Sequence, residues 1–279
     1  MYIYLNGDYV KDTEAAISPF DYGYLYGIGV FETFRIYNGC PFLLEDHLER
    51  MNNALGNMAI RKTVEKKEVE NIISQLLQLN RWINASIRLN ISAGKGAPAL
   101  RTLEFAEPTL MVYGGALSEA PETVQNKEAK VLTIRRNTPE GHIRWKSHHF
   151  LNNLLAKQEL DDPAIEGIFL TNEGYVAEGV TSNLFWRKDE TLYTPSVDTG
   201  ILNGITRQYV LTLCKRLGIH VQTGKFKKDH LLEADECFMT NSVQEIIAID
   251  KIDDKTFRGK NRRITNELFD CYKADRNKL

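Results

Sequence analysis

The chain has 279 residues, of which 43% are hydrophobic, and its 35 basic and 37 acidic residues give a formal net charge of −2. This composition is typical of a globular protein with one large domain or two ordinary ones, and it excludes a broad basic surface for nucleic acid or acidic membranes. No apolar run reaches the roughly 18 residues of a membrane-spanning helix, no signal peptide is apparent, and the four cysteines form no CxxC pair. We therefore expect a cytoplasmic protein with reduced thiols and no nucleic-acid or membrane partner.

The first 36 residues predict β structure. Asn6-Gly7 separates short apolar stretches at 2–5 and 8–10, which is a strong hairpin signal. The segment 22–30 combines three glycines with three tyrosines but lacks the third glycine and the following helix of a dinucleotide fingerprint. We expect its glycines to let the backbone approach something large. A strand is predicted at 31–37.

Helical periodicity follows at 45–58 and 65–79, and strands are predicted at 85–92 and 109–114. The next stretch is the most linker-like of the chain, because it is rich in small residues and contains Pro121. We place the domain boundary in this stretch, so the two predicted domains comprise residues 1–117 and 118–279.

Strands outnumber helices in the second domain and alternate with them irregularly, which favours an α+β fold in both domains over a doubly wound sheet. Strands are predicted at 130–135, 165–171, 219–222, 236–240 and 246–250, and helices are predicted from Phe150, from Gly204, at 228–233 and at 263–273.

One lysine, Lys146, lies between the apolar stretch 131–134 and the helical pattern that begins at Phe150. Desolvation at such a junction lowers the pKa of a lysine amine and makes the amine a nucleophile toward a carbonyl. The alternative is an ordinary solvated lysine at a helix start. His148 and His149 are adjacent, would point to different faces of the helix, and make a poor metal pair, so no metal site is predicted.

The glycine-bracketed loop 200–207 opens a predicted helix. The free N–H groups of Ile205 and Thr206, the Thr206 hydroxyl and the helix dipole would suit a phosphate, although an ordinary helix cap gives the same pattern. Asn241 and Ser242 end a predicted strand, and they either contribute to the same anion site or form a turn.

Two further charged residues have both a functional and an ordinary interpretation. Arg50 is a candidate for a bidentate phosphate contact, or a surface arginine paired with Asp46 or Glu49. Glu178, at the mouth of a predicted strand, is suited to hold a ring nitrogen protonated, which is a way of tuning pyridoxal phosphate, or is a surface glutamate.

The order of these features resembles the fold-type IV pyridoxal-phosphate enzymes, the class IV aminotransferase family, which contains D-amino-acid transaminases, branched-chain transaminases and aminodeoxychorismate lyases. The resemblance runs from Asn6-Gly7 to Gln244–Ile247. It implies pyridoxal 5′-phosphate as cofactor and two domains, a small N-terminal α+β domain and a C-terminal pseudo-barrel α/β domain. It also implies that Lys146 forms the Schiff base and that Glu178 faces the pyridine nitrogen. The implied phosphate contacts are Arg50, Ile205, Thr206 and Ser242, with Asn241 beside them.

Within this family the motifs are most similar to the bacillus-type aminodeoxychorismate lyases. The sister groups differ at three positions. D-amino-acid transaminases carry a tyrosine where Phe31 stands and a carboxylate-binding arginine where Ala93 stands, and branched-chain transaminases carry a tyrosine where Leu151 stands. The similar segments are 18–21, 27–35, 135–141, 146–153 and 180–188.

The resemblance implies a homodimeric lyase that converts 4-amino-4-deoxychorismate into 4-aminobenzoate and pyruvate in folate biosynthesis. Lys146 would remove the C4 proton and protonate the departing oxygen, while Glu178 would keep the ring nitrogen protonated. Two alternatives stay open: a D-amino-acid or branched-chain transaminase, and a non-enzymatic binding protein with Lys146 on its surface. The candidates for the substrate carboxylates are Arg88, Arg135, Arg136 and Arg144.

Overall fold

The computed structural model describes residues 1–97, 104–257 and 262–278. The chain forms two compact units, the first from residues 1–120 and 145–149, the second from 121–144 and 150–278. The five residues around Lys146 thus group with the first unit although their neighbours in the sequence belong to the second.

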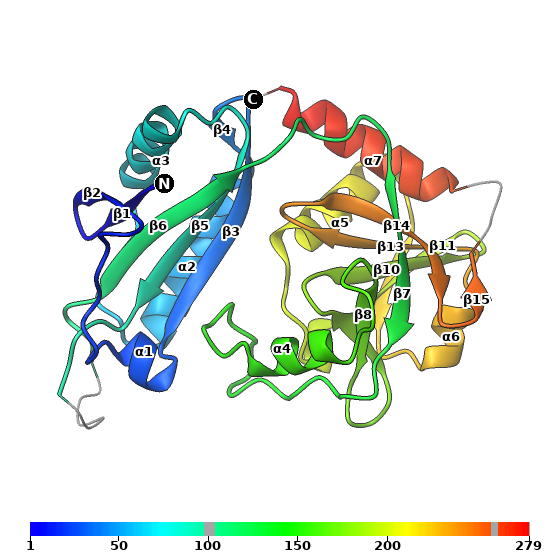
Figure 1. Ribbon diagram of the computed structural model, residues 1–279. Coiled ribbons are helices and arrows are strands. Elements are labelled where there is room, and N and C mark those ends of the chain that lie inside the picture. Colours follow the sequence, from blue (N-terminus) through cyan, green and yellow to red (C-terminus); the bar gives the residue numbers. More distant parts are fainter. Residues whose placement is uncertain (98–103, 258–261, 279) are drawn as a thin grey trace. The chain divides into compact units, whose positions relative to one another are not determined.

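The first unit is built on an antiparallel sheet with the strand order β2-β1-β6-β5-β3-β4 (Figure 1). The predicted hairpin is confirmed, with Leu5 opposite Asp8 and with Asn6 and Gly7 both at positive φ in the turn. The three longer strands predicted for this half are confirmed as β3, β5 and β6. The strands are β1 (Tyr2–Leu5), β2 (Asp8–Lys11), β3 (Gly29–Tyr37), β4 (Cys40–Pro41), β5 (Ala85–Ser92) and β6 (Thr109–Ala116).

Two amphipathic helices, α2 (Leu44–Asn57) and α3 (Lys66–Asn80), confirm the helical periodicity and pack on one face of this sheet (Figure 1). Their apolar sides form one core with Val30, Phe34 and Ile36 of β3. Because side chains alternate along a strand, the intervening residues of β3, which include Phe31, lie on the opposite face.

A short helix, α1 (Tyr22–Tyr26), occupies the segment in which only close backbone packing was predicted. The buried carboxylate of Asp21 caps it by accepting the Gly23 N–H at 2.7 Å. The same carboxylate accepts the hydroxyls of Ser92 and Thr109 at 2.8 and 2.7 Å, which ties α1 to β5 and β6.

The second unit contains a mixed sheet with the strand order β12-β11-β10-β13-β14-β7-β8-β9, and β15 pairs with β14. Three pairs are parallel, β11 with β12, β14 with β7, and β7 with β8. The strands are β7 (Gln125–Val131), β8 (Glu166–Leu170), β9 (Val176–Gly179), β10 (Asn183–Lys188), β11 (Thr191–Pro195), β12 (Val221–Gly224), β13 (Glu236–Asn241), β14 (Glu245–Ile252) and β15 (Lys255–Thr256).

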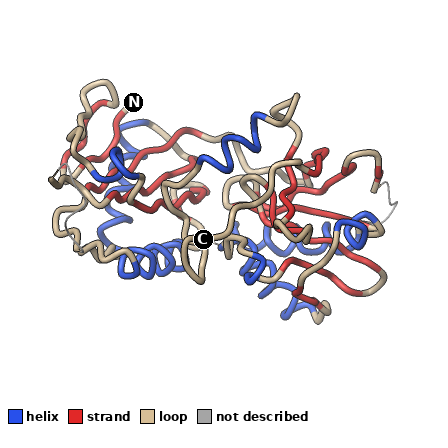
Figure 2. Tube along the Cα trace, turned by 90° about the horizontal axis from the view of Figure 1, so that it is seen from below, coloured by secondary structure: helices blue, strands red, loops and turns tan. Residues whose placement is uncertain are grey.

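Two long helices of this unit, α5 and α7, pack against β13 and each other. Figure 2 distinguishes the helices of the chain from its strands by colour. The α+β prediction is confirmed for the described parts of both units. No helix in these parts is long and apolar enough to cross a membrane. The helices are α4 (Leu151–Gln158), the 3-10 turn η1 (Val197–Thr199), α5 (Ile205–Leu217), α6 (Lys228–Leu232) and α7 (Arg263–Arg276).

The strand predicted around 131–134 is wrong in position, because β7 ends at Val131. The N–H groups of Thr133 and Ile134 donate to the carboxylate of Glu159 at 2.5 and 2.9 Å and so bond a side chain rather than a strand. The true strand was missed because most of its residues are polar, and its bonds to two neighbouring strands come from the backbone.

The helix predicted after Lys146 is confirmed as α4, but its orientation was unexpected. Its buried residues are Asn153 and Ala156. The leucines that produced the helical pattern, Leu151, Leu154 and Leu155, are between 44% and 66% exposed. The apolar side of α4 therefore lies on the surface of the single chain.

Candidate active site

Lys146 lies on an extended segment of the first unit, before α4 begins. This segment pairs with the start of β3: the Phe31 N–H donates to the Lys146 carbonyl at 2.9 Å, and the His148 N–H donates to the Gly29 carbonyl at 3.0 Å. The prediction that His148 and His149 lie on faces of a helix is therefore wrong, because both precede α4. Backbone pairing with β3 gives the lysine a rigid support.

Phe31 lies beside two cations. Lys146 Nζ is 4.8 Å from the centroid of the Phe31 ring, and Arg88 Cζ is 3.5 Å from the same centroid, both within the range of a cation–π interaction. Burial lowers the pKa of Arg88. Its Nε is buried and has no hydrogen-bond partner among the described residues. A guanidinium with an unsatisfied N–H is suited to receive an anion.

Arg50 is held by a buried carboxylate of β3. Its Nε and Nη2 donate to the two oxygens of Glu32 at 2.7 and 2.6 Å, and His47 Nδ1 lies 2.7 Å from Glu32 Oε2. Burial raises the pKa of Glu32, but the charge of Arg50 and the hydrogen bond from His47 outweigh burial and lower that pKa to about 2. Burial also lowers the pKa of His47. Arg50 is thus fixed in place, and phosphate binding by it remains a prediction.

Glu178 belongs to the second unit, in β9, and is only 4% exposed. Its Oε1 accepts Arg136 Nε at 2.8 Å, while its Oε2 accepts the Leu202 backbone N–H at 2.9 Å and Asn183 Nδ2 at 3.5 Å. These donors fix the orientation of the carboxylate. A carboxylate fixed in a buried place is suited to accept a hydrogen bond from a nearby ring nitrogen.

Two of the arginines considered for the substrate are already engaged within the second unit. Besides Glu178, the guanidinium of Arg136 donates to Asn152 Oδ1 at 2.8 Å. Arg144 donates through Nε to the Gly200 carbonyl at 2.5 Å and through Nη2 to the backbone carbonyl of Asn137. Burial and the adjacent charge of Arg136 lower the pKa of Arg144 to about 10.

The start of α5 forms the candidate anion site of the second unit. The Thr206 and Ser242 hydroxyl oxygens lie 3.3 Å apart, so the structure brings these two predicted residues together. Among the described residues no side-chain hydrogen bond caps the helix. A Cβ at Gly204 would lie 2.1 Å from Asn183 Oδ1, so the backbone before Ile205 needs a glycine. The free N–H groups, the helix dipole and two hydroxyls suit a phosphate.

The end of β13 adds one orphan hydroxyl to this region. Thr240 is buried, and its Oγ1 has no hydrogen-bond partner among the described residues. It stands opposite Asn183 in the sheet, so the two side chains share a face. Asn241 uses its Oδ1 to accept the N–H groups of Val243 and Gln244 at 3.0 and 2.8 Å, which is the turn role considered above. An unsatisfied hydroxyl and a glycine-lined helix start fit a phosphate-bearing cofactor.

Two groups that hold the charged site residues in place were not predicted, Glu32 for Arg50 and Arg136 for Glu178. Glu32 had a detectable signal, since it is the one acidic residue among the inward-facing positions of a hydrophobic strand. Arg136 had none, because its partner lies 42 residues away along the chain.

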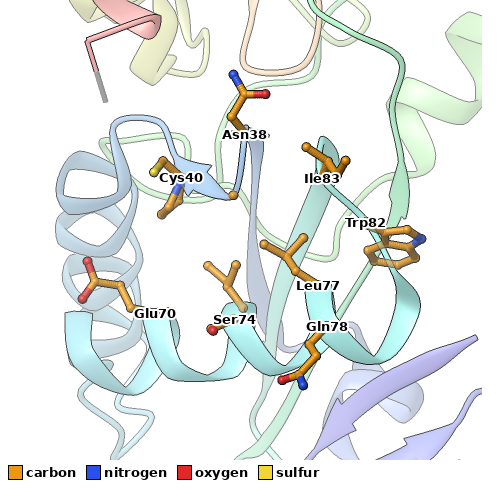
Figure 3. Close-up of a pocket in the computed structure, with 11 residues that line it drawn as sticks. Asn38, Cys40, Glu70, Ser74, Leu77, Gln78, Trp82 and Ile83 are labelled. Atoms are coloured by element: carbon orange, nitrogen blue, oxygen red, sulfur yellow. The ribbon is translucent and has the colours of Figure 1, made fainter.

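A hollow of about 460 Å³ in the first unit is a separate feature (Figure 3). Glu70, Ser74, Leu77 and Gln78 of α3 line it on one side, and Cys40 of β4 lines it on another. None of the predicted site residues lines this hollow.

The chain is similar to known proteins over most of its length. The chain matches the family model "Amino-transferase class IV" over residues 29–252. The aminodeoxychorismate lyase of Bacillus subtilis is 49% identical over 277 residues, which cover 98% of this chain and 94% of that protein.

Two solved structures match over almost the whole chain. The branched-chain amino acid aminotransferase of Escherichia coli has a TM-score of 0.88 at 25% identity, covering 98% of this chain and 93% of that one. The T.th. branched-chain amino acid aminotransferase, solved with pyridoxamine 5′-phosphate, has a TM-score of 0.87 at 28% identity, with coverages of 99% and 93%.

Proposed function

This chain belongs to the class IV aminotransferase family, and from that membership we propose that it is an aminodeoxychorismate lyase, which converts 4-amino-4-deoxychorismate into 4-aminobenzoate and pyruvate for folate biosynthesis. The observation that carries the proposal is the 49% identity to the Bacillus subtilis lyase, sustained over nearly the full length of both proteins. The expected fold-type IV architecture is confirmed by the two aminotransferase structures.

Pyridoxal 5′-phosphate is the cofactor that fits the residues described above. When bound, it supplies an electrophilic carbonyl carbon and an electron-withdrawing ring. Glu178 is the proposed partner of the ring nitrogen, because Arg136 and the Leu202 N–H hold its buried carboxylate in a fixed orientation. The proposed phosphate contacts are the N–H groups of Ile205 and Thr206, the hydroxyls of Thr206 and Ser242, and Arg50, with Asn241 shaping the adjacent turn.

Lys146 is the proposed base and acid of the reaction. Its amine removes the proton from substrate C4 and, as the ammonium so formed, donates a proton to the departing enolpyruvyl oxygen. The C–O bond breaks and pyruvate leaves. Loss of pyruvate makes the substrate ring aromatic, which gives the elimination a driving force that transamination lacks. Pairing of the lysine backbone with β3 keeps the amine beside Phe31 through both transfers.

Arg88 is the proposed partner of a substrate carboxylate. Arg136 and Arg144 are engaged by Glu178 and by backbone carbonyls, and Arg135 is exposed. The Arg88 guanidinium instead lies over the same aromatic ring as Lys146 Nζ, and its buried Nε lacks a partner among the described residues. A carboxylate on the substrate would satisfy that donor.

A branched-chain or D-amino-acid transaminase is the second candidate, and the match to the Escherichia coli aminotransferase structure supports it. Two residues weigh against it. Ala93 stands where D-amino-acid transaminases carry their carboxylate-binding arginine, and Leu151 stands where branched-chain transaminases carry a tyrosine. Neither residue supplies a polar contact for an amino-acid carboxylate.

We also propose that the enzyme acts as a homodimer in the cytoplasm. Large apolar side chains are exposed around α1, at Ile17, Phe20, Tyr24 and Tyr26, and a surface of this kind is typical of a protein interface. The four cysteines are free thiols, as expected in a reducing compartment.

The test is the fluorescence of 4-aminobenzoate formed from 4-amino-4-deoxychorismate by the cofactor-loaded enzyme without any 2-oxo acid. The lyase needs no acceptor, so product should accumulate, and Lys146→Ala should abolish both the product and the visible absorbance of the bound cofactor. A yellow, folded enzyme that is inactive here but converts D-alanine with 2-oxoglutarate would overturn the lyase and establish the transaminase.

A further inference from the structure

We infer that His148 is a positioning residue for Lys146, an inference that rests on the proposed role of this lysine. His148 follows the lysine by two positions, and its backbone N–H continues the pairing with β3 by donating to the Gly29 carbonyl at 3.0 Å. An isolated antiparallel bridge joins Ser147, between them, to Val30. This bridge consists of the two hydrogen bonds at Lys146 and His148, so the segment is anchored to β3 on both sides of Ser147.

The imidazole of His148 packs against the backbone of two glycines, Gly23 and Gly29. A Cβ at Gly29 would lie 2.3 Å from His148 Cε1, and a Cβ at Gly23 would lie 3.4 Å from His148 Nδ1. At Gly27 a Cβ would lie 3.0 Å from Cδ2 of the neighbouring His149. This confirms the expectation that these glycines let the backbone approach something large. The large groups are the two histidines that follow the lysine.

Two further contacts fix the orientation of the His148 ring. His148 Nε2 lies 3.0 Å from Asn90 Oδ1 in β5. Its ring is inclined by only 28° to that of Phe31, with centroids 6.4 Å apart. Phe31 in turn lies beside Lys146 Nζ. His148 therefore fixes the lysine at both ends, through its backbone to the lysine main chain and through Phe31 to the amine.

His148 is suited to this role because it stays neutral. Burial and the charge of Arg88 lower its pKa to about 4, with Asp21 opposing this and His149 adding to it. Near neutral pH the ring is therefore uncharged, and its Nε2 lies at hydrogen-bond distance from Asn90 Oδ1. A neutral imidazole also adds no further positive charge to the two cations, Arg88 and Lys146, that lie beside Phe31.

The test compares His148→Leu, which keeps the bulk but removes the hydrogen bond, with His148→Gln, whose amide N–H can still reach Asn90. The first readout is hydrogen exchange at the Phe31 amide in the cofactor-free protein, because that amide donates to the Lys146 carbonyl. The second is the rate of cofactor loading, and the third is the pH midpoint of the visible absorbance of the loaded protein. Both depend on the Lys146 amine.

We expect His148→Leu to speed hydrogen exchange at the Phe31 amide and to shift the pH midpoint of the absorbance. It should also slow cofactor loading by roughly tenfold, since small misplacements of a reacting group have effects of that order or larger. His148→Gln should restore all three toward wild type. Asn90→Ala should act in the same direction with the ring left in place. His220→Gln is the matched control, and because His220 is exposed and belongs to the second unit it should leave the three values unchanged.

Unchanged exchange, loading and midpoint in His148→Leu would overturn the inference. The same holds if only the melting temperature falls, because a ring that merely fills space would lower stability without moving the midpoint. A wild-type protein that takes up no borohydride-stable cofactor on Lys146 would instead overturn the proposed function. The exchange measurement on the cofactor-free protein would then still decide the role of His148.

Discussion

Arg136 and Glu178 form a buried ion pair in the second unit, with Nε donating to Oε1 at 2.8 Å and both side chains less than 10% exposed. Neither group can turn to water if the other is removed. The pair also connects two elements, because Arg136 donates to Asn152 in the first turn of α4. Glu178 is thereby held at a fixed place in β9.

Arg136→Gln is therefore expected to lower the free energy of unfolding of the cofactor-free protein by about 3 kcal/mol or more, the usual effect of leaving one buried charge without its partner. Urea denaturation measures this. Lys66→Gln is the control. Lys66 Nζ lies 2.6 Å from Glu45 Oε1, but both side chains are largely exposed, and exposed ion pairs stabilise a protein little. Equal, small effects of both substitutions would contradict the importance of the buried pair.

Acid should destabilise the first unit through Glu32. Its pKa is lowered to about 2 in the folded chain, below the unfolded value, so its contribution is fully present above about pH 4.5 and is lost as the pH falls toward 2. This loss is on the order of 3 kcal/mol. The lowered pKa of His47 acts in the same direction at higher pH, because the unfolded chain binds that proton first.

Glu32→Gln should flatten the fall in stability between about pH 4.5 and pH 2, measured by urea denaturation at a series of pH values. It should also lower stability at neutral pH, because Arg50 and His47 lose the negative charge and one of the two acceptor oxygens of Glu32. Glu45→Gln on the surface serves as the control and should keep the wild-type profile. An unaltered acid slope in Glu32→Gln would mean that other carboxylates govern acid unfolding.

The parts of the fold that could be predicted are those with a strong local pattern. The helices around Leu48 and Ile73 show a regular apolar stripe, and the Asn6-Gly7 hairpin has a turn that few other sequences can form. Strand β7 lacked such a pattern, because its residues are mostly polar and parallel neighbours supply its hydrogen bonds. Helix α1 depends on a cap from Asp21, which in turn needs β5 and β6 in place.

The residues of the candidate site also fall into those that a local pattern predicts and those that only the folded chain reveals. Thr206 and Ser242 could be named from a loop motif and a strand end, and they do lie together. The partners of Glu178 could not be named, since Leu202 and Arg136 reach it only after the loop before α5 and the strands of the second unit have folded. Local patterns identify residue types suited to a chemistry, whereas the contacts that orient those residues come from segments distant in the sequence.

Arg88→Gln should raise the KM for 4-amino-4-deoxychorismate by roughly 10- to 100-fold. A hydrogen bond to a charged group contributes about 1.5–3 kcal/mol to binding, and the substitution removes that contribution. The kcat should change less, because a carboxylate remote from C4 binds alike in the ground state and the transition state. Steady-state fluorescence of 4-aminobenzoate gives both constants. Arg61→Gln, at an exposed arginine of the same unit, should leave KM unchanged, and a KM of Arg88→Gln near wild type would remove Arg88 from the substrate site.

Gly204→Ala should weaken cofactor binding through a steric effect. The backbone of Gly204, at φ −64° and ψ 139°, is accessible to alanine, so no strain arises from the main chain. The new Cβ would instead lie 2.1 Å from Asn183 Oδ1, displacing the side chain that donates to the Leu202 carbonyl at 2.8 Å. We expect the Kd for pyridoxal phosphate, measured by titrating the cofactor-free protein, to rise about tenfold, which corresponds to about 1.4 kcal/mol. Gly115→Ala is the control, because a Cβ there meets nothing within 4 Å. If Gly204→Ala binds the cofactor as tightly as that control does, the start of α5 is not where the phosphate is held.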